Sequence, residues 1–340
     1  VYEQVSGDAA GVAAALTTGD VGGISDADSR AMRDSGLTHL VSISGLHVSA
    51  VIGAAYFLTL RLLALSPWLA LRVQLPIIAA GGGAIVGIAY TLLSGAQVPT
   101  VRSCIGALLV LCALVLGREA LTVRMLALAA FLVLVMWPEA LIGPSFQMSF
   151  SAVLAIVVLS GAAPIKRFLA PRDEGIIVRG GRQLAVLLLT GLVIECALMP
   201  TILFHFHRGG LYGAFANMIG IPLTTVIIMP SVLVGFLLDT LGLGAPAWWV
   251  VGKATGVLLA LAHWVASRPG AVTLLPSFGG GIFILFVVGG LWLALWNGRV
   301  RWFGFIPVAI GGVLVAINQP SDILVSGDGR HVSFVSESEG

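Results

Sequence analysis

Histidine and serine side chains are concentrated in one stretch near the start of the sequence, from residue 36 to residue 53. The side chains there that could hold a ligand or pass a proton are His39, Ser42, Ser44, His47 and Ser49. At 100° per residue, His39, Ser42 and Ser49 would fall within about 80° of arc on a helix. The stretch opens a long apolar run, and hydrocarbon tolerates polar groups only where they face protein or water.

Two interpretations of this polar stripe remain open. Small residues let helices approach closely, and serines can bond back to helix carbonyls, so the serines alone fit ordinary helix packing. Ionisable groups inside a membrane usually line a site or a pathway, however. Two histidines in one stretch therefore favour a functional face.

Two charged residues also lie within apolar segments. Arg102 follows Pro99 by one turn, and it either extends to the outer interface or faces a water-filled path, where a guanidinium could bind a phosphate through two hydrogen bonds. Glu195 lies deep in its segment, where a charge costs roughly 2.5–3.5 kcal/mol, so we expect it to be paired, protonated or hydrated. Lys253, Arg102 and the histidines are candidate partners.

Further polar residues lie at the start of two other apolar segments. Ser145, Gln147 and Ser149 open one, and either hydrogen bonding between helices or a polar path explains them. The segment from residue 211 to residue 238 holds Asn217 and Pro222. Because proline removes a backbone donor and clashes with the preceding turn, we expect this helix to be kinked or split.

The remaining histidines do not predict a metal site. His205 and His207 alternate at a segment end, but no carboxylate or third histidine follows at ligand spacing. His263 precedes Trp264, and we expect this pair at a membrane interface. The sequence contains no nucleophile elbow, nucleotide-binding loop or His-Glu-x-x-His motif, so we expect no cofactor.

Two functions can be constructed from these residues alone. In a proton- or ion-coupled transporter of small solutes, Glu195 and the histidines would form the relay. In an intramembrane hydrolase, a serine and a histidine such as Ser44 and His47 would pair, with Glu195 as the orienting acid.

Composition predicts the fold class. The chain has 340 residues, is 58% hydrophobic and 10% charged, and has a mean hydropathy of +1.03. Soluble domains carry about 25% charged residues, so we expect an all-α polytopic membrane bundle of about ten spans, some broken, with short soluble flanks. The net charge of +2 does not indicate nucleic-acid binding. The expected segments are 38–65, 75–94, 99–116, 121–137, 144–161, 183–204, 211–238, 248–266, 279–296 and 302–317.

The flanks differ from this apolar region. We expect residues 1–35 to form a soluble, surface-lying segment in which Ser25 caps a short helix, and residues 36–317 to form the transmembrane domain. Residues 318–340 contain a predicted β-hairpin that looks like the start of a truncated soluble domain, so we expect a fragment of a longer chain. The loop from residue 162 to residue 182 is rich in Lys and Arg, which places it in the cytoplasm and both termini on the outer face.

Four strings resemble the signatures of the ComEC-type competence family. The first runs from Gly36 to Val48 and contains Gly45 between the two histidines. The others, in family order, are Pro99-Thr100-Val101-Arg102-Ser103, Ser145-Phe146-Gln147-Met148-Ser149-Phe150 and Asn217-Met218-Ile219-Gly220-Ile221-Pro222. The sequence departs from the family pattern at Ser103 and Gly220, where Ala is usual, and at Met148, where Leu is usual.

The resemblance implies a channel, and not an enzyme, for uptake of single-stranded DNA across the bacterial cytoplasmic membrane during natural transformation. It implies a periplasmic DNA receptor and a cytoplasmic motor as partners, besides the lipid bilayer. The family's N-terminal OB-like and C-terminal metallo-β-lactamase-like domains are present here only as flanking pieces. The residues expected to line or brace the path are His39, Ser42, Ser44, Gly45, His47, Arg102, Gln147, Ser149, Glu195, Asn217 and Pro222.

Overall fold

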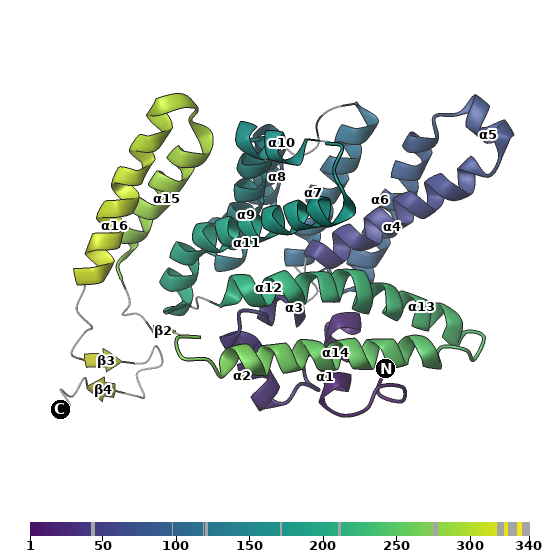
Figure 1. Cartoon of the computed structure of the whole chain (residues 1–340), viewed down its shortest axis with the longest axis horizontal. Helices are drawn as coiled ribbons and strands as arrows, with labels where there is room; N and C mark the ends of the chain where they lie inside the picture. Colours follow the sequence, from purple (N-terminus) through teal and green to yellow (C-terminus); the bar gives the residue numbers. More distant parts are fainter. Residues whose placement is uncertain are drawn as a thin grey trace. The chain divides into compact units, whose positions relative to one another are not determined.

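Over the residues that it describes, the computed structural model is helical apart from two pairs of very short strands, which confirms the predicted all-α class (Figure 1). It describes residues 1–41, 45–96, 98–117, 119, 122–170, 172–209, 212–271, 273–274, 278–317, 323–325 and 332–334. The chain forms two compact units, one of residues 1–195 and 210–272 and the other of residues 196–209 and 273–340.

The N-terminal segment, expected at the membrane surface, contributes to the main core of the first unit. Helices α1 (Asp8–Thr18) and α2 (Asp26–Asp34) both pack against α14 (Ala245–Ala266), and the short α3 (Thr38–Val41) follows them. Ser25 caps α2, as predicted, by accepting a hydrogen bond from the backbone N–H of Asp28. The apolar side chains of α1, including Val12 and Leu16, are buried in this core.

A second core joins the next helices of the same unit. Helix α4 (Gly45–Ala64) packs along α6 (Leu75–Leu93) and against α7 (Val98–Val115), and α5 (Pro67–Arg72) connects α4 to α6. Glycine permits this close approach, since a Cβ added at Gly87 would overlap the side chain of Ile52.

Helices α8 to α11 complete the middle of the chain. Helix α8 (Val123–Met136) leads through the 3₁₀ turn η1 (Pro138–Ile142) into α9 (Pro144–Gly161), and α10 (Ala163–Leu169) packs against α9. Helix α11 (Ile176–Phe206) has 31 residues and contains Pro200.

The proline-containing segment is one continuous helical run, which corrects the expectation that it could be split. Helix α12 (Gly213–Pro222) passes into a π-helical stretch η2 (Leu223–Ile228) and then into α13 (Met229–Asp239), alongside α14 (Figure 1). Pro222 has no backbone N–H to donate to the α-helical ladder. The helix widens here into π-helical turns, and Met229 N–H donates to the carbonyl oxygen of Thr224, five residues earlier.

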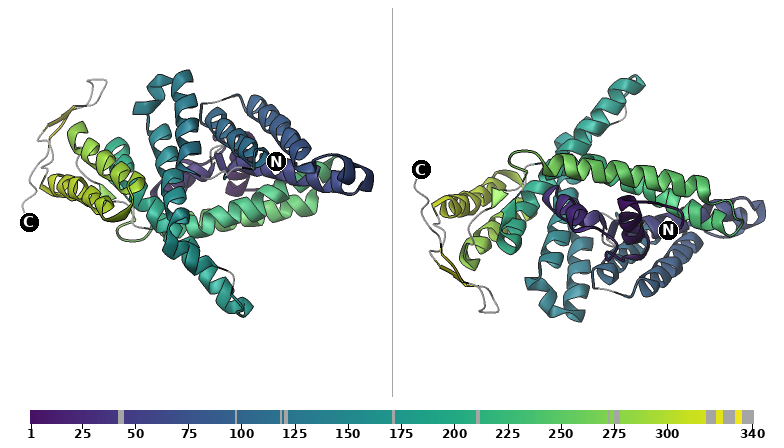
Figure 2. Two further views of the ribbon diagram at one scale, coloured as in Figure 1. Left: turned by 90° about the horizontal axis from the view of Figure 1, so that it is seen from above. Right: turned by 90° about the horizontal axis from the view of Figure 1, so that it is seen from below.

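The second unit is built around a helical hairpin. Helices α15 (Gly280–Leu295) and α16 (Phe305–Ile317) pack side by side through the 3₁₀ turn η3 (Gly298–Gly304), as Figure 2 shows. The last turns of α11 lie against α15, with the rings of Phe204 and Phe283 stacked at 4.4 Å. Strands β1 (Arg208–Gly209) and β2 (Thr273–Leu274) pair antiparallel. The predicted C-terminal hairpin is confirmed by the antiparallel pair of β3 (Ile323–Val325) and β4 (Val332–Phe334).

Each predicted apolar segment contains a helix, but six runs in the described part of the chain are long and apolar enough to cross a membrane. A crossing needs about 20 residues at 1.5 Å of rise each. Four further apolar helices are shorter within the part of the chain whose side chains are described, although the backbone of α4 itself extends over 20 residues. The six are Leu75–Leu93, Pro144–Gly161, Ile177–Phe206, Phe215–Asp239, Ala245–Ala266 and Arg299–Ile317; the shorter ones are Val48–Ala64, Thr100–Val115, Val123–Met136 and Gly280–Leu295.

Candidate functional site

The start of the first polar string, Gly36 to Leu40, lies along α12. Gly36 has φ of +76°, and a Cβ added to it would lie 3.2 Å from Cα of Gly213. About two turns further along α12, a Cβ at Gly220 would lie 3.0 Å from Leu37 and 3.1 Å from Leu40. Glycines at 36, 213 and 220 therefore let the segment before α4 lie directly on α12.

The carboxylate of Glu195 reaches the same place from α11. A Cβ added to Gly213 would lie 3.0 Å from Oε1 of Glu195, so this carboxylate borders the first residue of α12. The free N–H groups at a helix N-terminus carry partial positive charge, which stabilises a carboxylate there. The half-buried Glu195 thus meets α12 where Gly36 also approaches it. We call this meeting point the Gly213 junction.

Asn217 lies one turn beyond Gly213 on the same face of α12. Its amide oxygen Oδ1 is buried and has no hydrogen-bond partner among the described residues. A buried carbonyl oxygen without a partner is costly, so it is a group that an incoming donor would satisfy. Pro222 ends α12 and starts the π-helical stretch below this face.

His39 lies on α3, whose preceding residues pack on α12. Its ring nitrogen Nδ1 is 3.1 Å from the carbonyl oxygen of Gly36. The side chain is exposed. A neutral ring that donates from Nδ1 to Gly36 presents Nε2 as an acceptor.

Arg102 and Ser145, from two separate strings, contact each other. The Nη2 atom of Arg102 donates to Oγ of Ser145 at 3.0 Å, which joins α7 to α9. Only 8% of Arg102 is exposed, so its guanidinium is enclosed by neighbouring helices. Its Nε is buried and has no hydrogen-bond partner in the described part of the chain. The guanidinium thus retains an unused donor.

The other polar residues of α9 are placed differently. Gln147 donates from Nε2 to the carbonyl oxygen of Leu141 at 3.0 Å, which ties the start of α9 to η1. Ser149 is half-buried, one turn beyond Ser145. Phe146 and Phe150 lie with ring centroids 4.3 Å apart on the same helix. Gln147 therefore has a local structural bond, whereas Ser145 bonds across to another helix.

Part of the predicted set cannot be placed. Ser42 and Ser44 lie outside the described residues, and of Gly45 and His47 the structure describes the backbone of α4 only. Some of the predicted residues that are described form two groups, to which Gln147 and Ser149 do not belong. One is the Gly213 junction with Glu195, Asn217 and His39, and the other is the Arg102–Ser145 bond.

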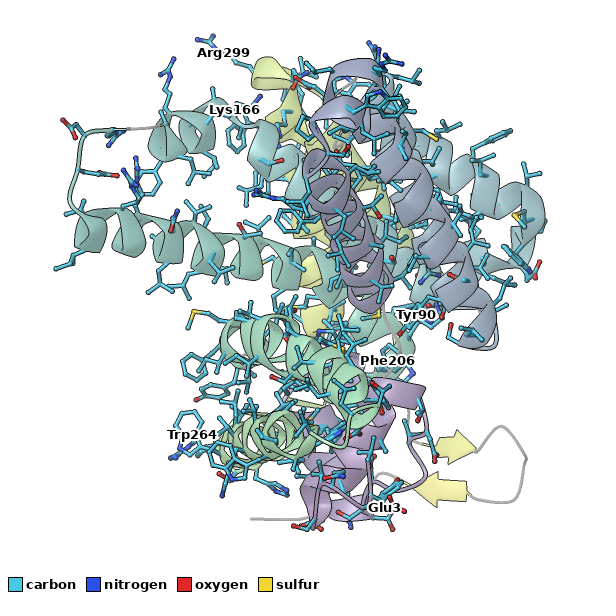
Figure 3. All side chains as sticks on the ribbon, turned by 90° about the vertical axis from the view of Figure 1, so that its right-hand side faces the viewer. Glu3, Tyr90, Lys166, Phe206, Trp264 and Arg299 are labelled. Carbon is cyan, nitrogen blue, oxygen red and sulfur yellow. The ribbon has the colours of Figure 1, made fainter. Side chains whose placement is uncertain are left out.

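Sequence reasoning missed one polar pair in the first unit. His263, expected at a membrane interface, has Nε2 2.7 Å from Oδ1 of Asp28, whose other oxygen accepts from Ser25 Oγ at 2.7 Å. Asp28 is 4% exposed, so the pair fastens α2 to α14. Trp264 beside it points outward, and Arg268 stacks on it at 4.4 Å (Figure 3). No sequence signal links residues 235 positions apart.

Among the described residues, no three His, Cys, Asp or Glu side chains converge in a way that could hold a metal ion. What the two groups offer is hydrogen bonding: a carboxylate, an unsatisfied amide oxygen, an imidazole and a buried guanidinium, all carried on apolar helices.

The sequence is similar to known proteins over most of its length. Residues 16–300 match the family described as "Competence protein". The chain is 24% identical to ComE operon protein 3 of Bacillus subtilis over 69% of its length, and 34% identical to competence protein ComA of Neisseria gonorrhoeae over 67%. It is 29% identical to the uncharacterized protein YcaI of Escherichia coli over 68%. These matches cover 27%, 30% and 29% of the respective relatives, so the chain corresponds to less than a third of each. No solved structure matches.

Proposed function

Because the chain belongs to the competence protein family, we propose that it forms the membrane channel through which single-stranded DNA enters a bacterium across its cytoplasmic membrane during natural transformation. The observation that carries this proposal is the extent of the family match, since residues 16–300 include every residue expected to line the path.

The proposed topology has about ten spans with both termini on the outer face. Six come from the long apolar runs, and the four shorter apolar helices would supply the rest by lying among them. A helix too short to cross alone can do so where its ends are covered by protein or where the bilayer thins.

The proposed path passes the Gly213 junction. A strand of phosphates and bases needs a hydrated route lined by groups that form hydrogen bonds without holding it tightly. Asn217 Oδ1 could accept from a base amino group, and Arg102 Nε could donate to a phosphate oxygen. Glu195, at the positive end of α12, would repel phosphates and keep them from settling on that helix N-terminus.

The partners we propose follow from the family. A receptor outside would deliver the strand and a motor inside would draw it in, since the sequence carries no nucleotide-binding loop to supply energy. The OB-like and metallo-β-lactamase-like domains of the family would complete a longer protein.

Transformation of the host bacterium tests the proposal. Asn217→Ala and His39→Ala should reduce transformation and the entry of labelled DNA into the cytoplasm to the level of a deletion strain, because both remove polar groups from the proposed path. The exposed Asn297, which precedes η3, provides a matched control, and Asn297→Ala should transform normally. Membrane abundance of each variant is measured in parallel. Normal DNA entry in both path variants would refute the assignment of these residues.

One observation favours a second candidate, a transporter of small solutes coupled to protons or ions. Glu195 is half-buried within a candidate span, beside a helix N-terminus. In proteoliposomes, Glu195→Gln would abolish flux driven by a pH gradient if this function held, while the exposed Glu139→Gln would not. A channel for DNA should instead pass oligonucleotides without any proton gradient.

A further inference from the structure

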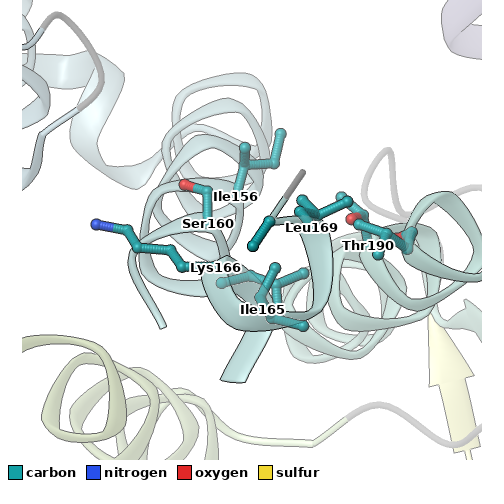
Figure 4. Close-up of a pocket in the computed structure, with 9 residues that line it drawn as sticks. Ile156, Ser160, Ile165, Lys166, Leu169 and Thr190 are labelled. Carbon is teal, nitrogen blue, oxygen red and sulfur yellow. The ribbon is translucent and has the colours of Figure 1, made fainter. Parts of the chain in front are cut away.

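A cavity of about 390 Å³ lies between α9, α10 and α11, and none of its lining residues belongs to the proposed path. Its walls are aliphatic: Ile156 and Leu159 come from α9, Ile165 and Leu169 from α10, and Val186 from α11. Figure 4 shows the side chains of α10 between those of the two longer helices. The volume falls within the range of small-molecule sites.

The floor of the cavity is fixed by a network of polar contacts. Arg182 on α11 donates from Nη1 to the carbonyl oxygens of Phe168 at 2.8 Å and Ala170 at 2.9 Å, at the end of α10. Its Nη2 also pairs with Glu174. These bonds satisfy the last carbonyls of α10 and fasten that short helix across the gap between α9 and α11. These polar contacts therefore hold in place the helices that form the cavity.

The rim of the cavity is basic. Lys166 lines it, and in Figure 4 its ammonium group extends away from the aliphatic walls, on the same side as the hydroxyl of Ser160. Arg167 is the next residue of α10, and Arg179 lies two turns before Val186 on the same face of α11. Residues 162–182 contain five basic and two acidic side chains, so the loop that carries the cavity has excess positive charge.

We propose that this cavity binds an acyl chain of an anionic phospholipid, whose phosphate contacts Lys166 and Arg167. Two features support this occupant. Helices α9 and α11 are both candidate membrane spans, so lipid chains adjoin the aliphatic walls. A basic cluster at the end of such a pocket complements the headgroups of anionic lipids.

The walls argue against nucleic acid as the occupant. Single-stranded nucleic acid is usually held by basic grooves combined with aromatic side chains on which bases stack. None of the residues lining this cavity is aromatic. An acyl chain needs only aliphatic contact, which is what the cavity provides.

Native mass spectrometry of the purified chain tests the proposal, with phosphatidylglycerol and phosphatidylcholine of identical acyl chains as probes. The wild-type chain should retain phosphatidylglycerol preferentially. The double variant K166E/R167E should bind it at least about thirtyfold more weakly, since the two lost basic residues account for roughly 1 kcal/mol each and the introduced carboxylates repel the phosphate further. The control is Arg299→Glu, an exposed arginine of the second unit, which should bind as the wild type does.

A variant that fills the cavity separates the acyl chain from the headgroup. Val186→Trp keeps all the basic residues and should still lose phosphatidylglycerol; Thr190→Leu, which also lines the cavity, provides the same test if the tryptophan prevents folding. Retention of lipid by both folded filling variants would overturn the proposal, as would equal retention of the two lipids by the wild type. A third result would also overturn the proposal: an oligothymidine that displaces the lipid from the wild type and still binds the variants with a filled cavity. The basic residues would then form a nucleic-acid site.

Discussion

Arg102 and Ser145 belong to two of the sequence motifs that resemble the family signatures, and a hydrogen bond joins their side chains. The substitution Ser145→Ala tests this hydrogen bond. The substitution removes the acceptor of the Nη2 hydrogen bond at 3.0 Å and leaves the fold of α9 intact. Because Arg102 is only 8% exposed and its Nε already lacks a partner among the described residues, the guanidinium would lose a hydrogen bond that it can hardly replace.

The magnitude follows from comparing two kinds of hydrogen bond. A bond to a charged group contributes about 1.5–3 kcal/mol in soluble proteins, whereas bonds between membrane helices average about 0.6 kcal/mol and reach about 1.7 kcal/mol. Ser145 itself is exposed, so water can take over part of the interaction at that end. We therefore expect Ser145→Ala to lower the free energy of unfolding by about 1 kcal/mol, between the two membrane values.

The assay is a double-mutant cycle on the purified chain, unfolded with sodium dodecyl sulfate in mixed micelles. Arg102→Met removes the charge while keeping an unbranched side chain, and Ser145→Ala should then cost almost nothing further. Ser149→Ala is the matched control, because this serine lies one turn further along α9 and does not bond to Arg102. Its free energy of unfolding should stay within about 0.5 kcal/mol of the wild type.

The reasoning would be refuted by additivity. If Ser145→Ala costs the same with methionine at position 102 as with arginine, the two side chains do not interact in solution. Arg102 would then have no measurable interaction with Ser145 on α9.

Two further predictions concern the first unit. Gly36→Ala should lower the free energy of unfolding by about 1–2 kcal/mol, since its φ of +76° disfavours any side chain. Gly53→Ala, with open space around it, should not destabilise α4. Asp28→Asn should lower the free energy of unfolding by about 1 kcal/mol, an effect reduced by the half-exposure of His263. The same change should have little further effect once His263→Ala has removed the partner, and full additivity of the two changes would contradict the pairing.

Much of the helical layout can be predicted from the chain alone, because apolar segments of this length and composition have few stable alternatives in a membrane. The ranges predicted for α6 and α9 differ from the observed helices by at most one residue. The helix cap at Ser25 and the hairpin of β3 and β4 could also be predicted from sequence, because both depend on residues that are neighbours in the chain. The number of spans was harder to predict, because hydropathy marks an apolar segment but does not decide whether its helix is long enough to cross.

The contacts between segments were decided by tertiary structure alone. The approach of Glu195 and Gly36 to Gly213 depends on three glycines whose missing side chains leave room, and the bond from His263 to Asp28 joins helices from opposite ends of the first unit. Composition and periodicity report which face of a helix is polar, but the partner of that face is set by how helices far apart in sequence pack. For this reason the sequence indicated a family and a set of polar residues, whereas the structure was needed to show which of them meet.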